Sequence, residues 1–451
     1  MIQLGEEQLN TLEKVKHFLK SDETCYSIVG AAGSGKSLLI KYLIEYLESV
    51  KIKYVLCAPT HKAKVVLERF TERPGITLHK LLSLSPNIEI LDLDFKDLRF
   101  YTNKSNLSEF PNKGVVICDE SSMVSDDLCD LLEEKCRNFN SKVIFVGDKA
   151  QLRPVKSDKS SKVFELENKS ILTKIYRQSE ESGLLDVLTT LRTDIIPKFE
   201  NVESKDGSLH CYDNAKDFLL KAIPYFNKAK STSDILEVKI LAYTNARVDA
   251  FNTKMKEVLF KDGKEYNKFE FITGCENIEF NNFKFWNSMD YIVVDEPVKK
   301  DVHIHNFMKL PGWNLNLYDS SDKKTSEIFI LSKEIPQDYY NSLAAHIEGT
   351  RLNAIELKQR RNRNSGKAWA DYYQIVGGFT SPVDLMYDNR VVRKKTFTGG
   401  YATTCHKSQG SSIQNVFVDM KNVMLCRNQD ELRQLQYVGL SRTRNNVYLL
   451  Q

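Results

Sequence analysis

Short apolar runs rich in β-branched residues recur along the chain, and each run ends in turn or polar residues. The clearest runs lie at 26–29, 54–57, 115–118, 143–146, 238–242 and 416–418. Helical patterns separate several of them, as at 38–47 and 128–136. Short apolar runs that alternate with helices are typical of parallel strands buried on both faces of a sheet. The pattern therefore predicts an α/β fold with parallel sheets.

Two stretches interrupt this pattern and are predicted to be inserts. Residues 83–111 are polar and contain an alternating segment at 90–95 that suits a hairpin. Residues 257–397 combine scattered strands with turn residues and all three tryptophans, so we expect this insert to be mostly β. The predicted units are a first α/β domain of residues 1–82 and 112–173 with the insert 83–111, and a second of residues 174–256 and 398–451 with the insert 257–397.

The composition is that of a globular protein. Of 451 residues, 41% are hydrophobic and 27% are charged, and the length suggests roughly three units. The net charge of +4 leaves any contact with nucleic acid to local patches. No apolar run approaches the roughly 18 residues that span a bilayer, and the polar N-terminus does not resemble a secretory signal. The nine cysteines lack C-x-x-C spacing, so we expect free thiols and a cytoplasmic location.

A glycine-rich segment follows the first predicted strand and opens a predicted helix. It fits the pattern G-x-x-x-x-G-K-[ST] and consists of Gly30, Ala31, Ala32, Gly33, Ser34, Gly35, Lys36 and Ser37. The backbone N–H groups of such a loop and the positive end of its helix bind phosphate oxygens. The segment therefore predicts a nucleoside triphosphate site, in which Lys36 reaches the β- and γ-phosphates and Ser37 holds Mg²⁺.

A second motif supplies the acidic groups that such a site needs. The apolar run at 115–118 ends in Asp119 and Glu120. We expect Asp119 to bind Mg²⁺ and Glu120 to polarise the attacking water. The two motifs together predict an ATPase or a GTPase. They leave open what the hydrolysis drives, since a kinase or a transporter subunit can carry a similar loop.

Further motifs follow in order along the chain. Their key residues are Thr60, His61, Lys62, Gln151, Arg177, Thr244, Asn245, Thr404, His406 and Arg442. In this order the motifs resemble those of superfamily 1 helicases. The sequences Gln151-Leu-Arg-Pro154-Val155 and His406-Lys407-Ser-Gln409-Gly410 are similar to the RecD-like branch, superfamily 1B, and to its phage helicases of the Dda type.

The resemblance implies both a fold and an activity. The fold would be two RecA-like P-loop domains with parallel sheets. Residues 83–111 would form a small hairpin insert with the strand-separating pin, and residues 257–397 a β-rich, SH3-like insert with a tower that braces the pin. The activity would be ATP-dependent 5′→3′ translocation on single-stranded DNA, with unwinding of duplexes or displacement of bound proteins.

The resemblance also implies roles around the nucleotide. Gln151 would sense the γ-phosphate, Arg177 and Arg442 would be arginine fingers, and Gln8 would read the adenine edge. Each residue also has a plainer interpretation. Gln151 could be a loop glutamine, each arginine could form a surface salt bridge, and Gln8 could lie on an exposed helix face.

Hydroxyl, amide and imidazole groups at the predicted strand ends suit neutral contacts with a sliding DNA strand. The candidates for DNA contact are Thr60, His61, Lys62, Thr77, His79, Thr244, Asn245, Thr404, His406, Lys367 and Trp369. Any of the threonines could instead cap a helix, and the basic stretch around Lys367 could be a solvated face. In the pin, Phe95, Phe100 or Tyr101 would offer a stacking face, or would pack down on a surface hairpin.

The implied ligands are ATP, Mg²⁺, single-stranded DNA and the junction between single and double strands. We expect a monomer, with replication or recombination proteins as partners and a phage as the source. Three alternatives stay open from the sequence. They are a DNA-dependent ATPase that remodels protein–DNA complexes, an RNA helicase of the same superfamily, and a binding module with an ATP switch.

Overall fold

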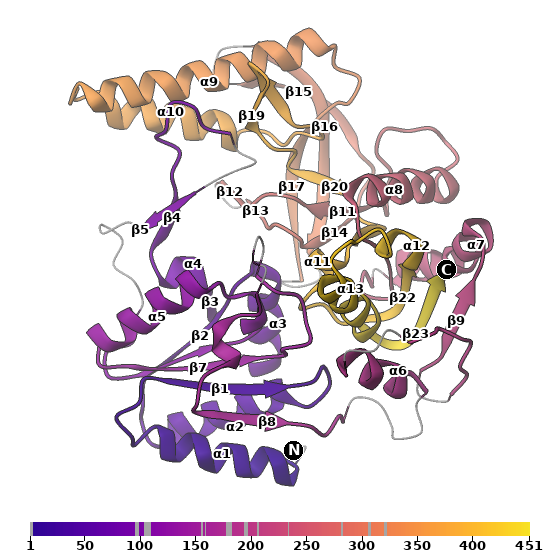
Figure 1. The fold of residues 1–451 in the computed structure, drawn as a ribbon. Helices are drawn as coiled ribbons and strands as arrows, with labels where there is room; N and C mark the ends of the chain where they lie inside the picture. The colour runs from indigo at the N-terminus through magenta and orange to yellow at the C-terminus, as the bar shows by residue number, and fades with distance from the viewer. Residues whose placement is uncertain are drawn as a thin grey trace.

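The computed structural model describes residues 3–94, 99–102, 110–154, 157, 159–176, 183–193, 197–204, 207–232, 234–280, 283–304, 308–319 and 323–451. Figure 1 shows two α/β lobes side by side, with a third, mostly antiparallel region above them. The chain starts in the first lobe and ends in the second.

The first lobe is built on a six-stranded parallel sheet. Its strands, in spatial order, are β3 (Gly75–Thr77), β2 (Tyr54–Ala58), β6 (Val115–Cys118), β7 (Lys142–Gly147), β1 (Cys25–Gly30) and β8 (Lys169–Leu172). Its helices are α1 (Glu6–Phe18), α2 (Lys36–Ser49), α3 (His61–Thr71), α4 (Leu78–Leu81) and α5 (Asp126–Asn138), with short 3-10 turns at Ser121–Met123 and Lys162–Phe164. One apolar cluster covers each face of the sheet, which explains why its strands are continuously apolar.

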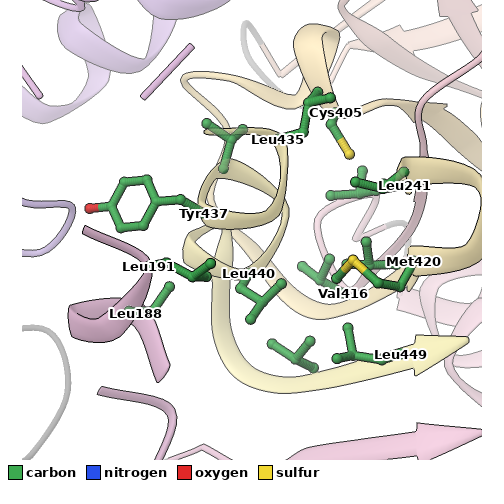
Figure 2. Close-up of a cluster of buried hydrophobic side chains, with 14 of the residues drawn as sticks. Leu188, Leu191, Leu241, Cys405, Val416, Met420, Leu435, Tyr437, Leu440 and Leu449 are labelled. Atoms are coloured by element: carbon green, nitrogen blue, oxygen red, sulfur yellow. The ribbon is translucent and has the colours of Figure 1, made fainter. Parts of the chain in front are cut away.

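The second lobe has a five-stranded parallel sheet. Its strands, in spatial order, are β21 (Ala402–Thr404), β10 (Val238–Ala242), β22 (Ile413–Asp419), β23 (Thr443–Leu450) and β9 (Leu209–Tyr212). Its helices are α6 (Gly183–Arg192), α7 (Ala215–Thr232), α8 (Asn245–Leu259), α11 (Cys405–Ser408), α12 (Met420–Val423) and α13 (Gln429–Ser441). Figure 2 shows one apolar cluster of this lobe, where Leu435 and Leu440 of α13 lie among side chains from the sheet and from α6. All the strands and helices named from the apolar pattern are present, so the predicted α/β fold is confirmed.

The third region contains an antiparallel sheet, where the sequence predicts a mostly β insert. Its strands run in the order β15 (Val298–Ile304), β16 (Met308–Asp319), β14 (Asp290–Val293), β11 (Phe271–Gly274) and β20 (Phe397–Gly399), and β17 (Lys324–Leu331) pairs with β16. Two hairpins accompany it, β12 (Ile278–Phe280) with β13 (Phe283–Phe285), and β18 (Leu385–Tyr387) with β19 (Arg390–Arg393).

The expectation of a mostly β insert missed a pair of helices. α9 (Gln337–Gln359) has 23 residues and α10 (Ser365–Gly377) has 13. Leu343, Ala344, Ile347 and Ile355 recur at helical spacing on α9 and are buried. This 3.6-residue period was the available signal, and the tryptophans and turn residues around it concealed it.

The small insert forms a hairpin, but not from the alternating segment. Strand β4 (Leu84–Pro86) pairs with β5 (Phe100–Thr102), and the described part of 90–95 has no strand. Phe95 lies outside the described residues, while Phe100 and Tyr101 of β5 are exposed. The reason is a tertiary contact. The buried guanidinium of Arg351 on α9 donates hydrogen bonds to backbone carbonyls in and beside this segment, which are then not available for strand pairing. Figure 1 shows the chain running from β4 up to α10.

Arg351 ties the small insert to the third region through three carbonyls of the insert. Its guanidinium donates to the carbonyl oxygens of Ile88 at 2.9 Å, Ile90 at 2.6 Å and Leu91 at 3.0 Å, and it is paired with Glu348 at 2.6 Å. Ile88 and Leu93 of the insert also belong to the apolar cluster of α9 and α10. The hairpin is therefore anchored on the third region as well as on its own lobe.

Replacing Arg351 by methionine should lower the free energy of unfolding by about 3–5 kcal/mol, because it leaves the buried Glu348 carboxylate unpaired and removes the donor to three carbonyls of the insert. The matched control is Arg360→Met, just after the same helix, whose exposed pair with Glu356 contributes less than about 1 kcal/mol. Thermal unfolding checks both variants. Equal melting temperatures for the two would contradict the anchoring role of Arg351.

Candidate nucleotide site and nucleic-acid interface

The glycine-rich loop joins β1 to α2, as its motif predicts. Gly33 and Gly35 have φ values of 85° and 79°, in the left-handed region that glycine adopts without strain. The Lys36 ammonium donates to the carbonyl oxygens of Gly30 at 2.9 Å and Ala31 at 2.8 Å. Ser37 is the second residue of α2, within its first turn. The loop thus gathers a cation, a hydroxyl and the positive end of a helix, the groups that bind a triphosphate.

Gln8 lies against this loop rather than on an exposed helix face. It is buried on α1, and its amide donates to the carbonyl oxygen of Ser34 at 3.0 Å and accepts from the N–H of Gly5 at 2.9 Å. Tyr176 lies beside it and donates its backbone N–H to the Gly33 carbonyl at 2.8 Å. A Cβ on Gly5 would lie 2.0 Å from the Tyr176 hydroxyl, so the ring is close to the start of α1. Tyr176 is a neighbour of the loop that sequence reasoning did not single out.

Asp119 and Glu120 follow β6 at the same edge of the sheet. Burial and, to a smaller extent, the charge of Glu120 raise the pKa of Asp119 to about 7. The Asp119 carboxylate accepts the backbone N–H of Glu120 at 2.9 Å. Glu120 has a φ of 50°, and its Oε2 is buried without a hydrogen-bond partner among the described residues. A strained residue with an unpaired carboxylate oxygen is typical of a catalytic base.

These residues fit the divalent metal that triphosphate hydrolysis uses. Asp119 offers oxygen, the ligand type that Mg²⁺ prefers, and so does the hydroxyl of Ser37. A bound cation would favour the charged form of Asp119 and so oppose the effect of its burial. The donor set therefore supports Ser37 and Asp119 as the residues that would hold Mg²⁺.

The second lobe reaches the phosphate loop through Tyr437 of α13. Its hydroxyl accepts the backbone N–H of Ala32 at 3.0 Å and donates to the buried Asp148 carboxylate at 2.7 Å. Figure 2 shows this side chain extending out of the apolar cluster of its own lobe. Burial and the charge of Asp148 raise the pKa of Tyr437 well above its usual value. A neutral hydroxyl thus joins the two lobes at the loop.

Arg192, at the end of α6, also reaches this junction. Its Nη2 lies 3.7 Å from Asp148 Oδ1, and its guanidinium lies over the Tyr437 ring at 6.0 Å. No motif in the sequence marks this arginine. Only the packing of α6 against α13 brings it to the loop, so sequence reasoning could not find it.

Gln151 is buried at the interface between the lobes. Its Oε1 accepts from Gln409 Nε2 of the second lobe at 3.1 Å, and the same amide donates to Ser122 Oγ at 3.0 Å. Arg442 is also buried. Its Nη2 donates to Ser441 Oγ at 3.2 Å, and its Nε has no hydrogen-bond partner within the described ranges. Arg177, the other predicted finger, lies outside the described residues.

The four candidate threonines share one structural role. Thr60, Thr77, Thr244 and Thr404 cap the N-termini of α3, α4, α8 and α11, and each hydroxyl accepts a backbone N–H of its helix. The plainer interpretation as helix caps is therefore correct for all four. Capping does not remove them from a DNA track, because a capped helix still presents its positive end.

The remaining candidates divide into exposed and packed groups. Asn245, Lys367 and, in part, His406 are exposed, and His406 lies 3.3 Å from Glu431. His61 stacks on Trp286 with ring centroids 4.3 Å apart, and His79 lies 5.0 Å from Phe100 of the hairpin.

Two candidates are partly buried and contact other parts of the protein. Lys62 is 3.9 Å from Asp290, which also binds Lys239 at 2.7 Å, and burial lowers the pKa of Lys62 to about 8. Trp369 packs against the apolar cluster of α9 and α10. The structure therefore gives Lys62 and Trp369 internal contacts, where the sequence alone suggested a role in binding DNA.

Replacing Tyr437 by phenylalanine should lower ATP hydrolysis about tenfold, because it leaves the Ala32 N–H and the Asp148 carboxylate without a shared partner at the junction of the lobes. The control is Tyr225→Phe, which removes a similar hydroxyl pair with Tyr448 inside the second lobe. Steady-state kcat and KM for ATP check the effect. Identical kinetics for the two variants would show that the Tyr437 hydroxyl does not couple the lobes.

Comparisons with known proteins agree with this geometry. A family model described as an AAA domain matches residues 3–214, and one described as a UvrD-like helicase C-terminal domain matches residues 399–450. The chain is 24% identical over 473 residues to the ATP-dependent DNA helicase dda of Enterobacteria phage T4, covering 99% of this chain and 98% of the relative. It is 22% identical over 475 residues to the RecBCD enzyme subunit RecD of Buchnera aphidicola, covering 97% and 72%.

Solved structures show the same fold. Pif1 helicase from Candida albicans aligns with a TM-score of 0.53 and 17% identity, over 100% of this chain and 95% of that one. Pif1 helicase from Bacteroides, in complex with ADP-AlF3 and single-stranded DNA, aligns with a TM-score of 0.51 and 18% identity, over 99% and 92%. The arrangement of two parallel sheets with inserts is thus that of the Pif1 helicases.

Proposed function

We propose that this chain, which belongs to the superfamily 1B or RecD-like helicases, hydrolyses ATP to move 5′→3′ along single-stranded DNA and to unwind the duplex ahead of it. The observation that carries the proposal is the junction at the phosphate loop. There, Tyr437 and Gln409 of the second lobe contact Ala32, Asp148 and Gln151 of the first. A nucleotide bound at this loop would lie where the two lobes meet, so its hydrolysis can change how they fit together.

The residues of the first lobe would divide the hydrolysis between them. Lys36 and the loop amides would bind the β- and γ-phosphates, and Glu120 would take a proton from the attacking water. Ser37 and Asp119 would hold Mg²⁺, whose charge offsets that of the phosphates. Gln151, Arg177 and Arg442 would respond to the γ-phosphate as the lobes close, and Gln8 would select adenine.

The DNA strand would cross both lobes at the capped helix ends. Thr60 and Thr77 lie in the first lobe, and Thr244 and Thr404 lie in the second. Contacts made alternately by the two pairs would turn cleft closure into steps along the strand. The β4–β5 hairpin, with exposed Phe100 and Tyr101, would act as the pin at the junction of single and double strands. We further propose that the chain works on DNA as a monomer in the cytoplasm. Among the described residues, no helix is long and apolar enough to cross a bilayer.

The deciding experiment measures ATP hydrolysis with and without single-stranded DNA, beside unwinding of duplexes with a 5′ or a 3′ overhang. We expect strong stimulation, and unwinding from the 5′ overhang alone. Unwinding from the 3′ overhang alone would reverse the direction and keep the helicase. Stimulation without unwinding from either end would favour a translocating remodeller. An absence of stimulation by DNA, together with stimulation by RNA, would move the substrate to RNA.

A further inference from the structure

A cavity of about 680 Å³ lies between the small insert and the third region, away from the nucleotide loop. Pro86 and Ile88 of the insert form one wall, and residues 370–377 of α10 form another. The third wall contains Glu276 and Arg393. Its volume is within the roughly 300–1,000 Å³ of typical ligand sites, so it has room for a ring system with attached groups.

The wall formed by Arg393 has unmet hydrogen-bonding capacity. Arg393 is 3% exposed, and its guanidinium donates through Nη2 to the Phe379 carbonyl at 2.9 Å. Its Nε and Nη1 are buried and have no hydrogen-bond partner among the described residues. Glu276 lies nearby, with its Oε2 3.9 Å from Nε, and this oxygen is also buried with no hydrogen bond from the part of the chain that the structure describes. A buried guanidinium is costly unless its N–H groups are bonded, so this wall suits a ligand with acceptors and donors on one edge.

The α10 wall supplies an aromatic face. Tyr373 lines the cavity and is 54% exposed, so its ring is open to a ligand. Tyr372 lines the same wall but is buried, packed edge-on against Tyr373 with ring centroids 5.4 Å apart. The buried ring of Tyr372 thus restricts the orientation of the exposed ring of Tyr373. Such a ring can stack on a flat partner without much loss of its own freedom.

We propose that this cavity binds one unpaired nucleobase of the DNA strand, stacked on Tyr373 with its polar edge toward Arg393 and Glu276. A nucleobase has the required shape and chemistry, since it is flat and carries donors and acceptors on one edge. Guanine fits best, because on one edge its O6 accepts from arginine while its N1 and N2 groups donate to a carboxylate. The cavity lies at the end of the β4–β5 hairpin where Pro86 pairs with Phe100, and this position favours a base from a strand that the hairpin has just parted. The inference therefore rests on the proposed function.

The test uses a DNA junction that fixes the position of each base relative to the hairpin. An abasic site is moved one nucleotide at a time along the single strand next to the junction, and the dissociation constant is measured for each substrate. For the wild-type protein we expect one position at which loss of the base weakens binding about 5- to 100-fold, the effect of one base stacked on an aromatic ring. Tyr373→Leu should bind the intact strand as weakly as the wild type binds that abasic strand, and should show no position-specific loss.

Two further variants make the result specific. Tyr339→Leu removes a similarly exposed tyrosine, on α9 and outside the cavity, and should keep the wild-type profile. Glu276→Gln should reduce a preference for guanine over thymine at the sensitive position, because an amide can also donate to thymine. Melting temperatures establish that each variant is folded.

The outcomes separate the cavity from the helicase. A wild-type profile with no sensitive position, or an unchanged profile in Tyr373→Leu, would overturn the cavity while DNA-stimulated hydrolysis keeps the proposed function. If the mononucleotide dGMP competes with DNA for binding but no position of the strand is sensitive to loss of its base, the cavity binds a free nucleotide. That result would also overturn the proposal that it binds a base of the strand. A protein that neither binds DNA nor is stimulated by it would overturn both.

Discussion

Replacing Lys36 by alanine should abolish ATP hydrolysis and leave binding to single-stranded DNA measurable. The ammonium of Lys36 is held by the Gly30 and Ala31 carbonyls at the mouth of the phosphate loop, at 2.9 and 2.8 Å. Alanine removes the cation that offsets charge on the transferred phosphoryl group, and loss of a single such group typically lowers kcat about 10²–10³-fold. Because Lys36 also orients the phosphates, we expect a loss at the upper end of this range or beyond it.

The matched control for this variant is Lys14→Ala, an exposed lysine of α1. It should hydrolyse ATP and bind DNA as the wild type does. The measurement is phosphate release at saturating ATP and DNA, beside anisotropy of a labelled oligonucleotide. Hydrolysis by Lys36→Ala at the wild-type rate would show that the loop is not the catalytic nucleotide site.

Replacing Glu120 by glutamine should separate nucleotide binding from hydrolysis. Glutamine keeps the size of the side chain and the left-handed backbone at φ 50°, but it cannot accept a proton from water. General-base catalysis contributes about 10²–10⁴-fold, so we expect kcat to fall by that factor while ATP affinity is retained. The buried Oε2 without a hydrogen-bond partner among the described residues is the group whose loss carries the effect.

The control for this second variant is Glu134→Gln, an exposed glutamate of α5. Binding of a fluorescent ATP analogue and single-turnover hydrolysis together distinguish the two possible roles of Glu120. Loss of nucleotide binding in Glu120→Gln, with a lowered melting temperature, would assign it a structural role instead.

The sequence was sufficient for the parts of the site that one segment of chain builds by itself. The loop around Lys36 needs only a strand, glycines at two left-handed positions and a helix, and all three are visible as local pattern. The strand that ends at Asp119 is likewise continuous and apolar. Where function depends on short-range geometry of this kind, residue type and spacing determine the outcome.

Contacts between distant segments were not predictable in the same way. Tyr437 lies 405 residues from Ala32, and Gln409 lies 258 residues from Gln151. Lys62 belongs to a helicase-like motif, yet its ammonium lies 3.9 Å from the carboxylate of Asp290 in the third region. In each case the packing of the lobes determines which residue is the partner. The pattern of a single sequence does not predict such long-range contacts.

The anchoring of the small insert by Arg351 has a mechanical consequence. The hairpin belongs to the first lobe by sequence, but its carbonyls and apolar residues are fixed to α9 of the third region, whose strand β20 leads directly into the second lobe. When the lobes rotate relative to each other around the nucleotide, the hairpin, the third region and the second lobe should therefore move together as one rigid unit. Each closure of the nucleotide cleft would sweep the hairpin across the face of the lobe that encodes it.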